Sequence, residues 1–422
     1  MEETQLKTHQ KKAIFLIDDD WPASKRSSAK MMFELARTFA DDGYSSVLLM
    51  PSNGPQKHLI SKSRMEGVEL WRYRCPNARG KSKLRRAFIE SQYALRALMA
   101  LWLTQPKDAL RFDICVNHAP SIFFGPLAGF LNKRGAFTYL VLRDFFPQWA
   151  IDEGLLRKNA LSTRYLQAFE RLTYRNAHKI GLQSQANIAV FESLHPQYQN
   201  HEVLVNWADV AKTKTKTKTK QAPSHLIKEL AGPLAGKTVF FYGGNMGHAQ
   251  DIPLLLQLVI ERASDKRSHF LFVGHGDHFD LVRRTINDKA LTNITLLPAV
   301  DQQDYDQLLD LADIGLLSLS GSHIAHNFPG KVIGYMTKSL PILGSVNPGN
   351  DLAEIINDTG CGLICESGDL GALTENASLL AKDAGLRGKM GRKAHKLLQT
   401  SFSATSAKKT IERAFMAHQD GL

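Results

Sequence analysis

The chain has 422 residues, more than one ordinary hydrophobic core accommodates, so two domains are expected. Hydrophobic residues make up 43% of it, which is typical of a folded globular protein and excludes a disordered one. The net charge of +12 favours an acidic partner, namely nucleic acid, an anionic membrane surface or a phosphorylated substrate. Because zinc-finger spacings and aromatic RNA-binding motifs are absent from the sequence, no nucleic acid partner is expected.

The cysteines and the first residues favour a cytoplasmic location. Cys75, Cys115, Cys361 and Cys365 include no C-x-x-C pair, which argues against a zinc site or a disulfide framework and fits a reducing compartment. No secretory signal is visible at the N-terminus. The longest apolar stretch, residues 119–131, is shorter than the ~20 residues that cross a bilayer. Any membrane contact is therefore expected to be peripheral, on the inner face of the cell membrane.

Short apolar runs alternate with longer helical patterns through the first half of the chain, which is typical of a parallel sheet covered by helices. The expected strands are 13–18, 46–51, 68–73, 112–118, 137–144, 179–184 and 203–206. They are rich in Val, Ile, Leu and Phe, as strands that are covered on both faces must be. This pattern predicts a doubly wound, Rossmann-like domain over residues 1–205.

Polar residues follow several of these runs. Asp18, Asp19 and Asp20 end the first run, where they suit either a magnesium site or an ordinary turn before Trp21-Pro22, and the turn is the simpler account. His118 and Asp144 end two adjacent expected strands. Because the carboxyl ends of parallel strands lie along one edge, this pair is a candidate site for activating an acceptor, although a structural histidine and a structural Arg143–Asp144 pair remain alternatives.

Residues 84–103 form a helical pattern with two open interpretations. Its apolar face is wide and is flanked by Arg85, Arg86 and Arg96. The apolar positions are Phe88, Tyr93, Leu95, Leu98, Met99, Trp102 and Leu103. This pattern suits either a helix in the domain core or an interfacial helix that brings the protein to a lipid-linked acceptor.

The alternating Lys and Thr of residues 212–220 have no apolar member, which indicates a solvated loop or a contact with an anionic membrane. A second series of apolar runs follows it. The expected strands are 238–244, 269–276, 294–300, 314–320, 341–346 and 362–366. They predict a second doubly wound domain over residues 206–402. The helical pattern of 403–420 is compatible with packing back on the first domain.

Two segments of the second domain suit a diphosphate. Gly243 and Gly244, followed by Asn245 and Met246, lie where a strand turns into a helix, so their backbone N–H groups can approach an anion; a tight turn that needs glycine is the alternative. The second segment contains Phe328, Pro329, Gly330 and Lys331. Pro329 suits the first position of a helix, whose open end favours an anion. A lysine in that first turn is best explained by a bound phosphate.

Read together, these segments resemble the retaining family 4 glycosyltransferases of the GT-B fold, in which two Rossmann-like domains face a cleft. The segments that carry this resemblance are Gly-Asn-Met-Gly-His-Ala-Gln (244–250), Phe-Val-Gly-His-Gly (272–276), Ala-Asp-Ile-Gly-Leu-Leu (312–317), Pro-Gly-Lys-Val (329–332), Pro-Ile-Leu (341–343) and Gly-Cys-Gly (360–362). The first half is similar at residues 27–36, 143–147 and 206–209. Bacterial O-antigen and capsule transferases, including N-acetylfucosaminyl transferases, are the most similar branch.

The resemblance implies a hexosyl transfer with retention, from a nucleotide diphosphate sugar to a saccharide acceptor that is lipid-linked. Lys331 and the backbone of residues 243–246 would hold the diphosphate, Val300 would meet the base, and Ser27 and Ser28 would close over the donor. The acceptor would enter from the first domain, where the resemblance places a functional histidine near His118. No cofactor and no metal would be needed, because the lysine and helix ends neutralise the leaving diphosphate.

The sequence also departs from that family. Its two usual glutamates, one near the sugar and one on the ribose, align with His326 and Gly334, and Glu354 is a possible substitute for ribose recognition. The loss of both carboxylates keeps two alternatives open. One is a non-catalytic binding or scaffold subunit with the same fold, and the other is a nucleotide-sugar epimerase, which would need acid and base carboxylates at the sugar.

Overall fold

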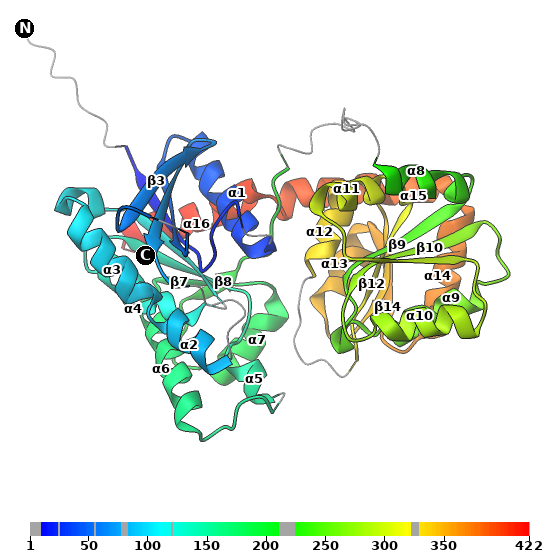
Figure 1. The fold of residues 1–422 in the computed structure, drawn as a ribbon, viewed down its shortest axis with the longest axis horizontal. Helices are drawn as coiled ribbons and strands as arrows, with labels where there is room; N and C mark the ends of the chain where they lie inside the picture. Colours follow the sequence, from blue (N-terminus) through cyan, green and yellow to red (C-terminus); the bar gives the residue numbers. More distant parts are fainter. Residues whose placement is uncertain are drawn as a thin grey trace, which may run out of the picture. The chain divides into compact units, whose positions relative to one another are not determined.

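A computed structural model describes residues 10–23, 26–54, 56–76, 83–119, 121–152, 154–210, 224–321 and 329–421. The chain divides into two compact units (Figure 1). The first unit comprises residues 1–205 and 404–422, and the second comprises residues 206–403. His326, Phe328 and the Lys-Thr run of 212–220 lie outside the described residues. The roles expected of them therefore remain predictions.

The first unit is built on an eight-stranded sheet in the order β3-β4-β2-β1-β5-β6-β7-β8. Its strands are β1 (Lys12–Leu16), β2 (Ser45–Ser52), β3 (Ile60–Met65), β4 (Val68–Arg74), β5 (Ile114–Ala119), β6 (Phe137–Leu142), β7 (Lys179–Leu182) and β8 (His201–Val203). Neighbouring strands are parallel except for the edge pair β3 and β4. Every expected apolar run overlaps a strand. β3 was not predicted, because this edge strand reads Ile-Ser-Lys-Ser-Arg-Met and exposes half of its side chains.

Helices cover both faces of this sheet. They are α1 (Ser27–Asp41), α2 (Lys83–Ser91), α3 (Tyr93–Thr104), α4 (Gly125–Asn132), α5 (Gln148–Asp152), α6 (Leu161–Arg175), α7 (Gln185–Leu194) and α16 (Ala404–Gln419). Successive side chains of β1 point to opposite faces. Ile14 and Leu16 pack in the core that includes α3 and α4, whereas Phe15 packs edge-on against Phe39 of α1. α3 and α1 therefore lie on opposite faces of the sheet.

The last helix, α16, packs against α1 in the first unit. Lys408 is almost fully buried there, and its ammonium pairs with Asp42 at 2.6 Å and with Glu412 at 2.6 Å. Phe415 of α16 lies 5.8 Å from the ring of Phe137 on β6. Two carboxylates and an aromatic contact thus hold the end of the chain on the α1 face of the first sheet.

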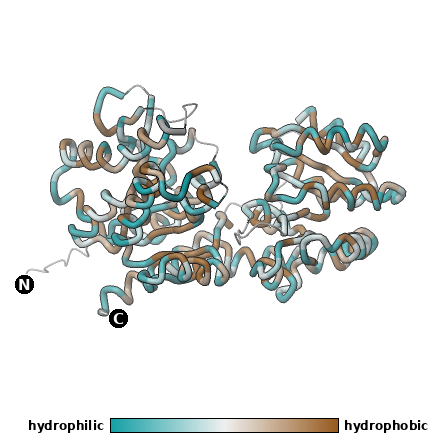
Figure 2. Tube along the Cα trace, turned by 90° about the horizontal axis from the view of Figure 1, so that it is seen from below, coloured by the Kyte–Doolittle hydropathy of each residue, from teal (hydrophilic) through white to brown (hydrophobic). Residues whose placement is uncertain are grey.

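The second unit has an all-parallel sheet in the order β11-β10-β9-β12-β13-β14. Its strands are β9 (Thr238–Asn245), β10 (Ser268–His275), β11 (Ile294–Pro298), β12 (Ile314–Ser318), β13 (Ile342–Val346) and β14 (Gly362–Glu366). Both ends of each strand agree with those of an expected strand to within two residues. The strands are the hydrophobic interior of the unit (Figure 2). The four inner strands β10, β9, β12 and β13 are buried on both faces over most of their length, and they carry the near-continuous apolar runs that made them predictable from sequence.

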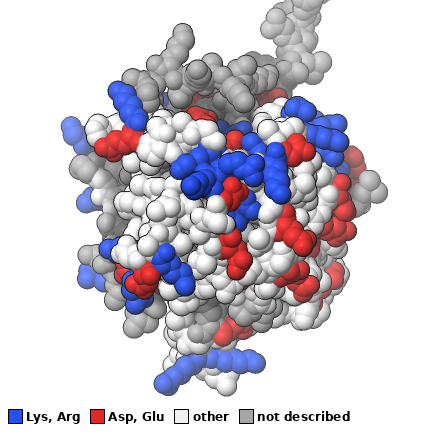
Figure 3. Space-filling model, turned by 90° about the vertical axis from the view of Figure 1, so that its right-hand side faces the viewer, with Lys and Arg blue, Asp and Glu red and all other residues white. Residues whose placement is uncertain are grey.

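Eight helices of the described second unit surround its sheet (Figure 1). They are α8 (His225–Leu234), α9 (Ile252–Glu261), α10 (Phe279–Asp288), α11 (Gln302–Asp310), α12 (Gly330–Thr337), α13 (Asp351–Thr359), α14 (Leu370–Lys382) and α15 (Ala384–Ser401). On the face drawn in Figure 3, the largest group of Lys and Arg lies near the upper centre, smaller ones lie toward the edges, and Asp and Glu lie beside and below the central group. The positive excess of the chain is therefore not spread evenly over this face.

Candidate donor site in the second unit

The strand order reverses at β9, which has β10 on one side and β12 on the other. Open parallel sheets bind ligands at the carboxyl ends of the strands at such a reversal. β9 ends there with Gly243, Gly244 and Asn245. The site expected from the glycine pair therefore lies at the position that the topology of the sheet makes available for a ligand.

Close packing explains Gly243, and backbone conformation explains Gly244. A Cβ atom on Gly243 would lie 2.3 Å from the hydroxyl of Tyr305, so this position has no room for a side chain. Gly244 has a φ of 125°, which favours glycine. Its nearest side-chain neighbour is Lys331, whose Cε would lie 3.8 Å from an added Cβ. The structural alternative thus accounts for Gly243, while Gly244 lies beside the candidate phosphate-binding lysine.

Lys331 is the most unusual charged residue of the site. Its Nζ has no accessible surface and no hydrogen-bond partner among the described residues, and it lies 3.7 Å from the ring centroid of Tyr242. The rest of the residue is only half-buried. Burial lowers the pKa of Lys331 to about 7. In the part of the chain that the structure describes, the partner of this desolvated ammonium is an aromatic face, which is unfavourable without an anion, so its environment suits a negatively charged ligand.

Tyr335 fixes the helix that carries this lysine. It lies one turn after Lys331 on α12 and is fully buried. Its hydroxyl donates to the carbonyl of Leu316 at 3.0 Å and accepts from the N–H of Gly243 at 3.4 Å. A Cβ on Gly315 would lie 2.3 Å from the tyrosine ring, so glycine at 315 allows this contact. Tyr335 thereby ties the start of α12 to the ends of β9 and β12.

The start of α12 differs by one position from the sequence prediction. Pro329 is the N-cap, with φ −64° and ψ 132°, and Gly330 is the first helical residue. The first N–H groups of a helix have no partner within the helix and favour an anion. Among the described residues, apart from the two chain neighbours of Gly330, no atom lies within 4 Å of the position that a Cβ on Gly330 would take. Glycine is therefore not required there for packing, and the helix end remains approachable.

Two of the other residues expected around the donor, Asn245 and Met246, make hydrogen bonds within the protein. The side chain of Asn245 donates to Gln250 at 3.2 Å. The N–H of Met246 donates to the carbonyl of His275 at 2.7 Å, and that of Gly243 is used by Tyr335. Gly244 and Asn245 are ladder residues of β9, paired with Gly274 and His275 of β10. Main-chain contact of residues 243–246 with a diphosphate therefore stays a prediction. Val300 is half-buried directly before α11, whose N-cap is Asp301.

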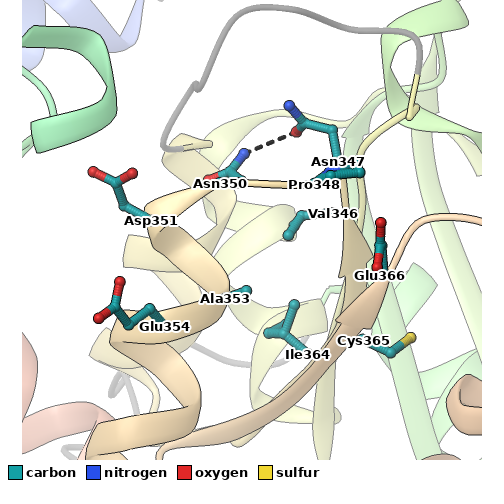
Figure 4. A pocket seen from close by; sticks show the side chains of 11 residues that line it. Val346, Asn347, Pro348, Asn350, Asp351, Ala353, Glu354, Ile364, Cys365 and Glu366 are labelled. Atoms are coloured by element: carbon teal, nitrogen blue, oxygen red, sulfur yellow. Dashed lines mark hydrogen bonds between the residues drawn. The ribbon is translucent and has the colours of Figure 1, made fainter. Parts of the chain in front are cut away.

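Glu354 lies in a separate cavity of 370 Å³ at the carboxyl ends of β13 and β14 (Figure 4). Glu354 and Asp351 project from the first turns of α13 on the same side, and the side chain of Asn350 donates to that of Asn347 at 2.9 Å. β13 lies two strands from β9, about 10 Å across the sheet. Gly334 aligns with one of the two missing glutamates. The nearest described atom to a Cβ added at Gly334 is a methyl carbon of Leu309 at 4.0 Å, so the surroundings do not exclude a side chain.

The candidate residues of the first unit lie at the ends of β5 and β6 and the start of α1. His118 is 3% exposed, and burial and then the charge of Arg143 lower its pKa to about 3. It is therefore neutral at pH 7, and Nε2 has no hydrogen-bond partner among the described residues. Asp144 is exposed, beyond the end of β6. The charge that acts on His118 thus comes from Arg143 rather than from the expected partner Asp144.

Ser27 and Ser28 begin α1, where Arg26 is the N-cap and Ser28 is half-buried. Arg26 lies 3.7 Å from Asp18 and 3.5 Å from Asp19. Asp20 accepts from Arg72 at 2.9 Å and from Ser52 at 2.8 Å. The carboxylates after β1 are thus engaged by arginines. Within the described ranges, no group of three or more His, Cys, Asp or Glu residues is arranged to hold a metal ion.

Sequence reasoning missed the two tyrosines that define the lysine environment. Tyr242 lies on β9 and Tyr335 on α12, and neither of them was given a role in the site from the sequence. The i, i+4 spacing of Lys331 and Tyr335 indicates that they share one helix face. Tyr242 lies on β9 and Lys331 on α12, so only the folded structure shows that the tyrosine ring lies under the ammonium.

Known proteins similar to this chain carry the same architecture. Residues 236–383 match the family described as "Glycosyl transferases group 1". This range contains all of the second-domain segments on which the glycosyltransferase resemblance was based, and it relates the chain to that family through its second unit. The finer assignment to retaining family 4 enzymes or to N-acetylfucosaminyl transferases stays a prediction.

A curated relative is described as "Probable glycosyltransferase WbjE" of Pseudomonas aeruginosa. It is 24% identical over 234 residues, which cover 56% of this chain and 57% of the relative. The chain is thus matched to little more than half the length of this relative.

Solved structures are similar over nearly the whole chain. Sucrose-phosphate synthase from Thermosynechococcus elongatus has a TM-score of 0.69 at 12% identity, over 98% of this chain and 100% of that one. HepE from Anabaena in complex with UDP has a TM-score of 0.66 at 14% identity, over 96% and 100%. A UDP-forming trehalose-phosphate synthase from Burkholderia xenovorans has a TM-score of 0.69 at 9% identity, over 96% and 100%. The expected GT-B fold is confirmed.

Proposed function

We propose that this protein is a glycosyltransferase that moves a hexose-type sugar from a nucleotide diphosphate sugar to a saccharide acceptor. The observation that carries the proposal is the buried ammonium of Lys331, without a hydrogen-bond partner among the described residues, beside Gly244 and the open start of α12. All three features lie within the segment that matches group 1 glycosyltransferases. A scaffold subunit has no use for an uncompensated buried cation, which is costly unless a ligand neutralises it.

The chemistry required of the site is stabilisation of the leaving nucleoside diphosphate. Lys331 supplies a full positive charge, and the first N–H groups of α12 supply aligned partial charges. In a site that excludes water, such groups stabilise the charge that develops on the leaving oxygens. The proposal includes retention of configuration and independence of a divalent cation. An epimerase is less favoured, because Gly334 supplies no carboxylate for acid or base chemistry.

The proposed acceptor is a lipid-linked saccharide in the synthesis of a bacterial surface polysaccharide. The description of the Pseudomonas relative as a probable glycosyltransferase and the family resemblance support this role. His118, neutral and buried, would then contribute a hydrogen bond to donor or acceptor rather than a proton.

A thermal-shift panel of UDP, GDP and dTDP with the whole protein tests the function. We expect one of them to raise the melting temperature, because a ligand that binds only the folded state stabilises it. A free nucleotide concentration of 100 times Kd raises the free energy of unfolding by about 2.7 kcal/mol. The matching nucleotide sugar should then be hydrolysed or transferred with release of that nucleotide. A protein that stays folded and responds to none of the three would contradict a donor site.

The affinity for the nucleotide sugar is expected to fall as the pH rises from 7 to 9. Without ligand the pKa of Lys331 is about 7, and a diphosphate beside Nζ raises it. Above pH 7 binding must therefore take up a proton, and the Kd rises by up to about tenfold per pH unit until the pKa of the complex is passed. Calorimetry in buffers of different ionisation enthalpy measures this proton uptake. An affinity independent of pH over this range would contradict the assignment of Lys331.

A further inference from the structure

α2 and α3 of the first unit expose an apolar face. The sequence predicted one helix over 84–103, whereas the structure has two, separated at Gln92. Five large apolar side chains are more than half exposed: Phe88 (66%), Leu95 (60%), Met99 (54%), Trp102 (71%) and Leu103 (58%). Four of them lie on α3, within nine consecutive residues. We call these five residues the α2–α3 face.

The other side of α3 already forms part of the domain core. Tyr93, Ala94, Ala97, Ala100 and Leu101 are buried in the cluster that packs on β1, β2 and β4. At 100° per residue these positions are centred opposite the exposed ones. The core-helix interpretation is therefore correct for half of the helix surface. It leaves the α2–α3 face unexplained, because a helix that is apolar all round is normally covered on all sides.

Charged residues beside the face are mainly basic. Arg85 and Arg86 are exposed on α2, and Arg96 lies on α3 with its side chain bonded to Gln92. Lys107 is exposed just beyond the end of α3. Glu90 on α2 is engaged by Arg86 at 2.7 Å. Two copies of such a surface would bring like charges together, whereas an anionic bilayer complements both its apolar centre and its basic margin.

Trp102 and the flanking aliphatic residues suit the membrane interface in particular. Tryptophan is enriched at the headgroup level, and basic side chains extend from an inserted helix toward anionic headgroups. None of the helices in the described ranges is long and apolar enough to span a membrane. We infer that the α2–α3 face docks the protein in the plane of an anionic lipid bilayer.

The same two helices border a polar cavity of 130 Å³, and Arg86 belongs both to the basic margin of the face and to the lining of this cavity. Arg86 and Glu90 of α2 and Tyr93 of α3 border it, together with Asp18 and Arg26. Docking through the α2–α3 face would bring this cavity toward the headgroup region. That it receives the polar part of a lipid-linked acceptor rests on the proposed function, whereas docking itself does not.

Co-sedimentation of the whole protein with vesicles, without any nucleotide, tests the inference. We expect binding to vesicles of phosphatidylglycerol and phosphatidylcholine, and much weaker binding to phosphatidylcholine alone or in high salt. The double variant Leu95→Gln and Met99→Gln should lose binding by about tenfold or more, because it removes two apolar side chains from the buried area. The matched control is Met416→Gln on α16, 50% exposed on the opposite face of the sheet, which should bind like the original protein.

Trp102 gives a second readout that does not depend on sedimentation. Its fluorescence should shift to shorter wavelength on addition of anionic vesicles, and Trp102→Phe should remove the shift while preserving most of the binding. The inference is overturned if folded wild-type protein ignores anionic vesicles, or if the double variant binds as well as the control. It is also overturned if the double variant converts a dimer into a monomer, because the face would then be covered by a second copy. Failure of nucleotide binding affects only the proposed function.

Discussion

Replacing Lys331 by Met is expected to abolish nucleotide binding and to stabilise the ligand-free protein at the same time. Removing a preorganised charge from the leaving diphosphate should lower kcat/KM by about 10²–10³-fold. The ligand-free protein should melt at a higher temperature, because an apolar chain of similar length replaces a buried ammonium that has no acidic partner among the described residues. A residue that serves only the fold would lower the melting temperature instead.

The pH dependence of stability provides an independent check of this variant. Lys331 has a pKa of about 7 in the folded protein and 10.5 when unfolded. Between these values the unfolded state binds more protons, so its contribution to the free energy of unfolding rises with pH, and this part of the slope should vanish in the Lys331→Met variant. Lys338→Met is the matched control: it removes a lysine from the C-cap of the same helix, at the end away from the site. Its ammonium pairs with Asp310 at 2.6 Å near the surface, so we expect less than about 1 kcal/mol of lost stability and unchanged nucleotide binding. Equal behaviour of the two variants would contradict the role of Lys331.

Gly274→Ala is expected to be among the most destabilising single substitutions in the second unit. A Cβ at this position would lie 1.8 Å from the carbonyl oxygen of Gly244 on the neighbouring strand, a backbone atom that cannot rotate away. β10 and β9 would have to separate where they carry the candidate site. We expect a loss of about 3 kcal/mol or more in the free energy of unfolding and a weakened nucleotide response.

Gly388→Ala is the control for this substitution. Gly388 is exposed inside α15, and the nearest described atom to an added Cβ is a guanidinium nitrogen of Arg392 at 3.5 Å, an ordinary van der Waals contact. Alanine there should leave the stability unchanged or raise it by up to about 1 kcal/mol. Chemical denaturation of both variants measures the difference. A Gly274→Ala protein as stable as Gly388→Ala would show that the contact between β9 and β10 is looser than the structure indicates.

The sequence by itself determined which segments form the two parallel sheets. Their central strands are buried on both faces, so each needs a near-continuous apolar run, and the runs expected at 13–18 and 341–346 lie on β1 and β13. β3 was missed for the opposite reason, because an edge strand keeps its polar residues in water. The sequence also identified Gly244 and Lys331 as partners in one candidate site, since strand-to-helix turns and helix starts lie along the same edge of such a sheet.

Only the tertiary structure decided the environments of those residues, because burial and charge depend on segments far apart in the chain. The folded structure places the ring of Tyr242 against the ammonium of Lys331. It also leaves this ammonium without a carboxylate partner among the described residues. Arg143 rather than Asp144 acts on His118 because the side chains after β6 are buried to different degrees. Apolar periodicity alone could not separate the core side of α3 from its exposed side, since both consist of apolar residues and only the position of the sheet distinguishes them.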